Sequence, residues 1–496
     1  MDILIGKGDE KVYLKSEMIN RHGLIAGATG TGKTTTLRVI VEALSELGVP
    51  VFLPDVKGDI FSLTKPGDID ENISERINSI GMDFNPRAYD IELWDVFGEM
   101  GHPVRITISE MGPLLLSNLL DLNEVQEGIL NIVFRVADDE GLLLLDLKDL
   151  KSMLQYVLDN SKELRGKYGN ISSASVGAIQ RSLLVLENEG ADYFFGEPAL
   201  EIEDIIRQDS EGGGVINILN SKLLHQKPRL YATFMVWILS ELYENLPEVG
   251  DNELPKLVFF FDEAHILFQY GSKVLIEKLT QVVRLIRSKG VGIFFVTQRP
   301  NDIPEEILSQ LGNKIQHALR AFTPKDRKAI KETAQNFRDN PNFSTEEVLT
   351  NMPSGYALVS TLDADGLPNI TEKTMIAPPK SSFEALSANE IRELIPSDMD
   401  KKYRNSVDRE SAFEILEERI LLKKEQDKKL EAEEAKRKEE IRRDQDEARA
   451  ERQKKRNKSE LEKQIGRMTN SALNSISRTL GNKILRGILG GLTGKK

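Results

Sequence analysis

The fold is decided by a glycine-rich stretch at residues 27–34, which reads Gly27-Ala28-Thr29-Gly30-Thr31-Gly32-Lys33-Thr34. It fits G-x-x-x-x-G-K-[S/T], the pattern of the loop that holds nucleotide phosphates. The glycines let successive backbone N–H groups turn toward one anion, and a helix that begins there adds its positive end. In this pattern Lys33 reaches the β and γ phosphates and Thr34 holds Mg2+. Residues Gly27 to Thr35 are therefore predicted to bind ATP with Mg2+.

The flanking segments supply the context that this pattern requires. Residues 24–26 predict a short buried strand that enters the loop, and apolar residues at helical spacing predict a helix from 35 to 47. A second strand is predicted at 51–55. The loop thus lies at a strand-to-helix turn of a β-α-β unit. Asp55 and Lys57, just past the second strand, either face a ligand crevice or form an ordinary polar turn.

A later apolar run ends in two carboxylates. Residues 257–261 predict a buried strand that leads directly to Asp262 and Glu263. This arrangement fits a Walker B strand, in which Asp262 holds Mg2+ through water and Glu263 polarises the attacking water. His265 completes the letters D-E-A-H of one helicase class, but the other boxes of that class are absent from the sequence. We expect His265 to pack beside the carboxylates.

Two further strands also end in polar residues. Residues 291–296 lead to Gln298, which can contact the γ-phosphate, and residues 313–318 lead to Arg320. The first twenty residues predict only one weak strand, at 12–14. The remaining predicted strands are 91–97, 215–219, and a hairpin of 357–360 with 369–376; the remaining helices are 229–246, 273–288 and 325–337.

The chain is predicted to contain a nucleotide-binding core interrupted by a helical insertion. Leucines and valines at helical spacing fill the insertion, and we assign them to its core. The predicted divisions are 1–108 (first part of the core), 109–210 (insertion), 211–380 (second part of the core), 381–458 (linker and charged helix) and 459–496 (tail).

Composition favours a cytoplasmic globular protein. The sequence has no cysteine, which excludes disulfides and thiolate metal sites, and shows no signal peptide or membrane-length apolar run. The net charge is −13, and residues 409–496, with 24 Lys and Arg against 17 Asp and Glu, leave residues 1–408 at −20. This acidic body argues against a broad nucleic-acid-binding face, although a local basic patch or channel remains compatible with it.

The C-terminal region combines a charged helix with an amphipathic tail. Residues 409–458 contain 32 charged residues, with acidic residues four positions before basic ones, which favours a solvated single helix. Apolar heptad positions are too sparse for a long coiled coil. Residues 459–496 form a basic amphipathic, glycine-rich stretch that either docks on this chain or a sister subunit, or contacts a membrane surface or a partner protein.

These motifs resemble the HerA–FtsK superfamily of ring ATPases. The resemblance rests on R-H-G-L-I-A before the loop, F-F-F-D-E-A-H at residues 259–265 and R-S-K-G-V-G-I-F-F-V-T-Q-R-P at residues 287–300. The stretches G-H-P-V-R, E-M-G-P-L-L-L, G-A-I-Q-R and F-F-G-E-P-A-L are similar to the bacterial HerA-like (YjgR-type) family. The resemblance implies an α/β, RecA-like P-loop NTPase fold with a mostly parallel central sheet, and a hexameric ring with ATP bound between subunits.

The resemblance also implies roles for four further residues. The arginine finger that acts on a neighbouring subunit corresponds to Arg287, with Arg320 as a second candidate, and Arg21 and Asp55 correspond to nucleotide-site residues of the family. HerA proper carries a β-barrel before its motor that docks a nuclease. Here about twenty residues precede the first strand, so the resemblance does not extend to a nuclease partner.

Two functions from different classes remain open. The first is a Mg2+-dependent ATPase ring that translocates or remodels DNA, as a helicase or translocase. The second is a nucleotide-switched scaffold that recruits a protein or membrane partner through its C-terminal tail. A small-molecule kinase is disfavoured, because the insertion offers no evident acceptor site and Glu263 suits activation of water.

Overall fold

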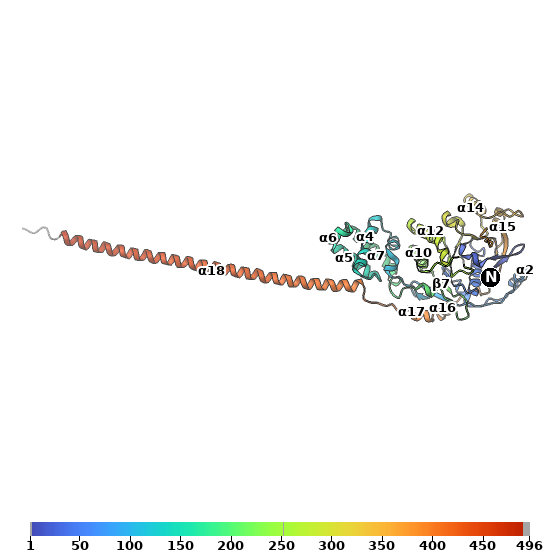
Figure 1. Ribbon diagram of the computed structural model, residues 1–496, viewed down its shortest axis with the longest axis horizontal. Coiled ribbons are helices and arrows are strands. Elements are labelled where there is room, and N and C mark those ends of the chain that lie inside the picture. The colour runs from blue at the N-terminus through green and yellow to red at the C-terminus, as the bar shows by residue number, and fades with distance from the viewer. Residues whose placement is uncertain (1, 251, 490–496) are drawn as a thin grey trace, which may run out of the picture. The chain divides into compact units, whose positions relative to one another are not determined.

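The computed structural model describes residues 2–250 and 252–489 (Figure 1). Within them, twelve strands form one sheet in the order β2-β1-β12-β11-β10-β3-β9-β8-β4-β7-β5-β6. The first five strands of this order, β2 to β10, pair antiparallel with their neighbours. From β10 onward, through β3 to β6, neighbouring strands pair in parallel. The predicted mostly parallel α/β sheet is confirmed. The strands are β1 (Ile3–Lys7), β2 (Lys11–Leu14), β3 (Gly23–Ala26), β4 (Val51–Asp55), β5 (Ile91–Asp95), β6 (His102–Pro103), β7 (Ile216–Asn220), β8 (Leu257–Phe261), β9 (Val291–Thr297), β10 (Asn313–His317), β11 (Tyr356–Ser360) and β12 (Glu372–Ile376).

All the strands expected from the sequence are present, whereas β1 and β6 were not expected. β1 lies between β2 and β12, and its pairing with β2 shifts register between Leu4 and Gly6. A Cβ at Gly6 would lie 2.0 Å from the Met375 carbonyl oxygen, so the position requires glycine. A glycine within a short strand weakens the sequence signal, because it usually marks a turn or bulge.

Helices cover both faces of the sheet. The phosphate-loop helix α1 (Lys33–Glu46) packs on one face, and α10 (Pro228–Asn245) and α12 (Lys273–Leu285) pack on the other. The alternation along β8 shows the division: Phe260 belongs to the core beneath α1, while Phe259 and Phe261 belong to the opposite core. An apolar run without polar interruptions is what a strand buried on both faces requires.

The insertion is helical, as predicted. Its apolar residues join the core on the α10 and α12 face, so residues 1–416 form one compact unit. Its helices are α3 (Ile108–Leu119), α4 (Glu124–Glu140), α5 (Leu147–Asp159), α6 (Ser161–Tyr168), α7 (Ser173–Asn188), α8 (Ala191–Phe194) and α9 (Ile202–Ile205).

The segment that follows the core, residues 381–416, packs on it through a few buried contacts. Tyr403 is fully buried against Trp94, with ring centroids 5.3 Å apart. Ser411 donates from Oγ to Asp149 at 2.5 Å. These contacts are widely spaced and partly polar, which is why the sequence suggested a linker here. Short helices in this segment are α16 (Ala388–Leu394) and α17 (Asp398–Tyr403).

Residues 417–496 form the second unit, described here by itself. Its described residues, 417–489, belong to the long helix α18 (Ala412–Leu489), which confirms the predicted charged helix. The predicted pair of Glu434 with Lys438 is present at 3.6 Å. Residues 490–496 and most side chains after 473 of the predicted amphipathic tail lie outside the described residues. Over the part of the chain that is described, no helix is long and apolar enough to cross a membrane.

A buried polar clamp ties α1 to the end of the core. Arg38 Nη2 donates to Ser381 Oγ at 2.7 Å and to the Ser382 carbonyl oxygen. Glu42 accepts from the backbone N–H groups of Lys380 at 2.6 Å and Ser381 at 3.2 Å. These two charged side chains of α1 are thus buried and hydrogen-bonded to the same short segment, although Arg38 Nε has no partner. The bonds fix the helix that carries the phosphate loop.

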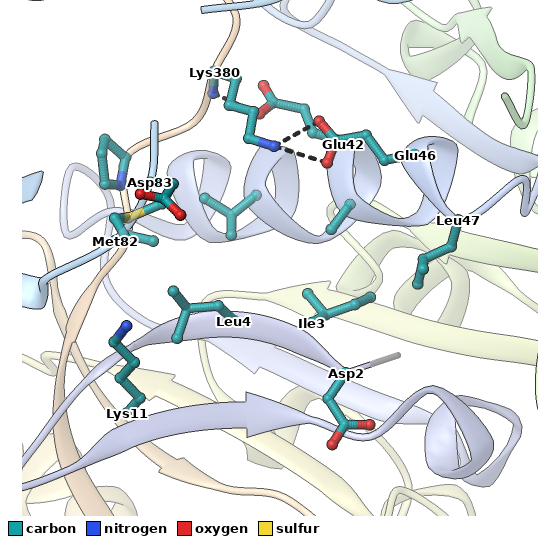
Figure 2. Close-up of a pocket in the computed structure, with 14 residues that line it drawn as sticks. Asp2, Ile3, Leu4, Lys11, Glu42, Glu46, Leu47, Met82, Asp83 and Lys380 are labelled. Carbon is teal, nitrogen blue, oxygen red and sulfur yellow. Dashed lines mark hydrogen bonds and ion pairs between the residues drawn. The ribbon is translucent and has the colours of Figure 1, made fainter. Parts of the chain in front are cut away.

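A pocket of about 420 Å3 lies beside this clamp, between α1 and β1 (Figure 2). Its cations already have partners: Lys380 Nζ reaches both oxygens of Glu46 at 2.7 and 2.8 Å, and Lys11 donates to a backbone carbonyl. The other charged groups that line it are carboxylates, including Asp2 and Asp83. This pocket therefore does not suit a phosphate group.

Removal of the buried acid should destabilise the fold. In Glu42→Ala, Arg38 would lose its nearest negative charge and two backbone N–H groups would lose their acceptor. We expect a loss of about 3 kcal/mol, measured by thermal or urea unfolding. Glu277→Ala, which breaks an exposed pair with Lys273, should cost no more than about 1 kcal/mol. Equal losses in the two variants would contradict the role of the clamp.

Candidate nucleotide site

Backbone pairing brings three loops to one edge of the sheet. β3 lies between β9 and β10, and β9 separates it from β8. Pairing continues past the strand ends: Gly27 N–H donates to Thr297 O at 3.2 Å, and Ala264 N–H donates to Val296 O at 2.9 Å. The phosphate loop, the two carboxylates and the end of β9 therefore share the carboxyl edge, where ligands bind in open α/β sheets.

The loop conformation depends on its glycines. Gly30 and Gly32 have φ angles of 76° and 115°, a region that other residues rarely adopt. A Cβ at Gly27 would lie 2.5 Å from the Cβ of His317. Only glycine fits at these positions, and the resulting turn leaves backbone N–H groups free to face an anion.

Lys33 lies folded onto the loop. Its ammonium donates to the carbonyl oxygens of Gly27 at 2.7 Å and Ala28 at 3.2 Å. Burial lowers the pKa of Lys33, while the negative charge of Glu263 acts to raise it. Thr34 and Thr35 follow in the first turn of α1 and are half-buried. Phosphate oxygens of a nucleotide would offer this ammonium the same acceptor chemistry as the two carbonyls.

The carboxylate pair lacks sufficient positive charge within the described chain. Burial, and secondarily the charge of Glu263, raises the pKa of Asp262 to about 7. Glu263 Oε2 is buried without a hydrogen-bond partner, and the Lys57 ammonium lies 3.8 Å from its other oxygen. His265 Nδ1 lies 3.4 Å from Oε2, so it packs beside the pair as expected. A site of this kind is suited to an additional cation.

The donor set fits Mg2+ shared with phosphates. In the described residues no group of three or more His, Asp or Glu side chains forms a complete metal cage. Mg2+ commonly binds through one or two protein oxygens together with waters and phosphate oxygens. The hydroxyl of Thr34 and the carboxylate of Asp262 are the protein groups that would hold it.

Asp55 has a positional role in this structure. It is buried, and its carboxylate accepts from the backbone N–H groups of Lys57 at 3.0 Å, Gly58 at 2.7 Å and Ile60 at 2.9 Å. These bonds hold the turn that places Lys57 beside Glu263. Asp55 thus holds a polar turn, and Lys57 lies beside the carboxylate; a role of either residue at the nucleotide site stays a prediction.

Gln298 and Arg320 lie on the other side of the loop. Both line a pocket of about 370 Å3 together with Ala28 and Thr29. Gln298 is exposed toward this pocket from the end of β9, whereas Arg320 also donates to the Thr350 carbonyl oxygen at 3.0 Å. The carboxyl edge thus combines the loop, the carboxylates and Gln298, as the sequence predicted.

His317 was not recognised from the sequence. Its ring bridges Thr36 Oγ1 and the Tyr356 carbonyl oxygen, both at 2.9 Å, directly beneath the loop. Burial lowers the pKa of His317 to about 4, so the ring is neutral at pH 7. His317 lies one residue before the end of a predicted strand, and no local sequence pattern marks it as part of the site. Its hydrogen-bond partners, Thr36 and Tyr356, come from distant segments.

Arg21 and Arg287 lie at the opposite edge of the sheet. Arg21 precedes β3, and Arg287 precedes β9, whose seven residues span about 20 Å. Both flank His22, whose pKa is lowered to about 4 by burial and, to a smaller degree, by the charge of Arg287. The nucleotide-site role that the resemblance implied for Arg21 is not met within one chain, because Arg21 lies at the end of β3 opposite the phosphate loop. The role of Arg287 toward a neighbouring subunit stays a prediction.

The buried ring of His317 predicts a pH dependence of stability. Because folding lowers its pKa, the stabilisation is complete above about pH 6.5 and is lost as the pH falls toward 4. At pH 5 we expect a loss of about 2 kcal/mol from this group. His317→Gln should show a correspondingly smaller fall in unfolding free energy between pH 7 and 5. His22 contributes equally to both proteins and cancels; identical pH profiles would refute the assignment.

Comparison with known proteins places this site in a family. A family model described as "Helicase HerA-like C-terminal" matches residues 2–496. The chain is 24% identical over 365 residues to the DNA double-strand break repair helicase HerA of Sulfolobus acidocaldarius, and 26% identical over 377 residues to that of Sulfurisphaera tokodaii. In both cases the match covers 72% of this chain and 66% of the relative, so the chain spans just under two thirds of these proteins.

Two solved structures have a partly similar chain path. The plasmid coupling protein TrwB in complex with a non-hydrolysable GTP analogue has a TM-score of 0.48 at 14% identity, covering 76% of this chain and 90% of TrwB. VirB4 of Thermoanaerobacter pseudethanolicus has a TM-score of 0.47 at 19% identity, covering 76% and 96%. Because the family model extends over residues 2–496, the chain belongs to the helicase HerA-like C-terminal family.

Proposed function

We propose that this protein is a Mg2+-dependent ATPase that works as a ring and moves or remodels DNA in the cytoplasm. One observation carries the proposal: the groups for ATP hydrolysis meet at the carboxyl edge of the sheet, while Arg287 lies at the opposite edge. A site divided in this way is completed only by a second copy of the chain. The family's named helicases support DNA as the substrate.

The residues of one chain supply binding and activation of water. Backbone N–H groups of the loop and the Lys33 ammonium hold the phosphates of ATP. Mg2+, when bound with the nucleotide, would neutralise charge developing on the phosphates. Glu263 orients and deprotonates the attacking water, and Lys57 restrains that carboxylate from 3.8 Å. Gln298, exposed beside the loop, is suited to sense the γ-phosphate.

The neighbouring chain supplies positive charge for the transition state. An arginine that enters from another subunit can accelerate phosphoryl transfer by about 10³–10⁵-fold. Arg287 is the first candidate, because it lies on the edge remote from its own loop; Arg320, on the loop edge, is the second. A hexamer is the ring size that the family resemblance implies. Hydrolysis would then depend on assembly.

The alternative is a nucleotide-switched scaffold that recruits a partner through α18. Its exposed apolar side chains, including Leu461, Ile465 and Met468, favour such contacts. This function would use the same ATP site, and the two differ in whether DNA stimulates hydrolysis. ATPase activity that DNA left unchanged, without DNA binding at low salt, would favour the scaffold.

Glu263→Gln should separate binding from hydrolysis. The amide keeps the size of the side chain but cannot accept the proton of water, so we expect a fall in ATP turnover of at least about 10²-fold with ATP affinity retained. Turnover is measured by phosphate release and affinity by a fluorescent ATP analogue. Glu277→Gln, on the exposed face of α12, is the matched control. Full turnover in Glu263→Gln would overturn the assignment.

Mixing two inactive variants tests the shared site. Arg287→Ala should lower turnover by about 10³-fold or more, because the transition state loses the positive charge from the neighbouring subunit. Glu263→Gln is inactive for a different reason, the loss of the group that accepts the proton of water. In an equal mixture about one interface in four combines an intact Glu263 with an intact Arg287, so activity should return. Arg284→Ala, one helical turn away, should stay active. A mixture without activity, although mixed assemblies form, would exclude Arg287 as the trans residue.

A further inference from the structure

A compact basic segment interrupts the acidic body of the protein. Residues 1–408 carry a net charge of −20, yet residues 320–331 contain five Lys and Arg and a single acid, Asp326. The segment comprises the loop after β10 and the first two turns of α14 (Pro324–Gln335). Such a local concentration of charge creates a positive field that the total charge conceals.

The single acidic residue of this segment, Asp326, does not neutralise the exposed lysines and arginines, because its carboxylate is buried and hydrogen-bonded to other groups. Asp326 is buried, and its Oδ2 accepts from Phe322 N–H at 3.1 Å, from Thr323 N–H at 2.9 Å and from Thr323 Oγ1 at 2.9 Å. Its Oδ1 accepts from Arg299 at 2.8 Å. These bonds cap α14 and hold the preceding loop in one conformation.

The cations face solvent. Lys325, Arg327, Lys328 and Lys331 are all exposed, and the last three lie within one turn of each other along the helix. The nearby Glu332 is shared between Lys328, at 3.6 Å, and Asn301, at 2.6 Å. Most of the positive charge on this face is therefore uncompensated.

An aromatic side chain stands beside these cations. Phe322 is 88% exposed, the highest value among the large exposed hydrophobic side chains of the described residues. Its backbone is fixed by Asp326, so the ring is presented from a rigid loop. Exposure of a phenyl ring to water is unfavourable, and a ring flanked by cations is the combination that binds single-stranded nucleic acids, with phosphates on the cations and a base on the ring.

We propose that this surface, formed by Phe322, Lys325, Arg327, Lys328 and Lys331 and named here the α14 surface, binds a DNA strand. The lysines and arginines contact its phosphates, and Phe322 stacks on an unpaired base. The inference deepens the proposed function and rests on it. The α14 surface would be the place where the chain binds its DNA substrate, and it would favour single-stranded segments there.

The α14 surface also adjoins the nucleotide site. Arg320, Phe322 and Asp326 line the same pocket of about 370 Å3 as Thr29 of the phosphate loop and Gln298. A strand held on this surface would lie next to the phosphate loop and Gln298. DNA bound there would therefore stimulate ATP hydrolysis, and hydrolysis would change the affinity of the α14 surface for DNA.

The test is a charge reversal in the full-length protein, Lys325→Glu with Lys328→Glu and Lys331→Glu. The matched control reverses Lys162, Arg165 and Lys167 on α6, which changes the net charge by the same amount. Binding is measured by fluorescence anisotropy with labelled oligothymidine over a range of salt concentrations. We expect at least tenfold weaker binding at low salt, a salt slope smaller by about 2, and loss of DNA-stimulated ATPase activity in the α14 variant alone.

The aromatic contact has its own variant. Phe322→Ala should weaken binding of oligothymidine by about tenfold and binding of duplex DNA much less, while Phe322→Trp should retain affinity. Equal losses on both substrates would overturn stacking on an unpaired base.

The remaining outcomes separate the two proposals. If the wild-type protein binds DNA and the α14 variant binds it as well as the α6 control does, the surface is refuted and the proposed function stands. If the wild-type protein binds no DNA, the DNA-directed function and this surface both fall. If the variant loses self-association in sedimentation, and DNA binding falls only with assembly, the surface is a contact between subunits and the proposal is overturned.

Discussion

Parallel pairing of β3 with β9 and β10 is the constraint on which the site depends. It places the end of β3 beside the ends of β9 and β10 and one strand away from the end of β8, so that the phosphate loop, Glu263 and Gln298 meet at one edge. Hydrogen bonds from Gly27 to Thr297 and from Ala28 to Ala318 extend this pairing into the loop itself. The strands are rigid because both faces are buried, and the catalytic geometry inherits that rigidity.

The site is electrostatically incomplete within one chain. Two adjacent carboxylates lie at a poorly solvated edge of the sheet, where burial raises the pKa of Asp262. Lys57 and Lys33 are the nearby cations that oppose their charge. An arrangement of this kind is costly without a cation, and it becomes favourable when a metal–nucleotide complex supplies positive charge and accepts hydrogen bonds. The fold therefore holds the two carboxylates in position for a ligand, and their burial lowers the stability of the ligand-free protein.

Buried polar contacts also connect the phosphate-loop helix to distant segments. The Arg38 and Glu42 side chains, hydrogen-bonded to residues 380–382, join this helix to the segment that continues toward α18. His317 joins the same helix to β11 through Tyr356. Each connection uses buried hydrogen bonds between segments far apart in the sequence. A displacement of the phosphate loop would therefore alter the hydrogen bonds to residues 380–382 and to β11.

The sequence by itself determined the phosphate loop, the Walker B carboxylates, Gln298 and the order of the principal strands and helices. Local rules suffice for these features, because glycine spacing, apolar runs and strand-end polar residues act over a few positions. It also predicted the charged helix, since pairs four residues apart are a local property.

The tertiary structure alone decided which distant residues support or surround that site. Asp55 proved to hold a turn for Lys57, His317 proved to brace the loop, and Arg287 proved to lie at the far edge of the sheet. The basic α14 surface was hidden in an acidic composition, because its single acid is withdrawn into the interior by hydrogen bonds. The physical reason is the same in each case: burial and partnership depend on contacts across the sheet, which no short stretch of sequence encodes.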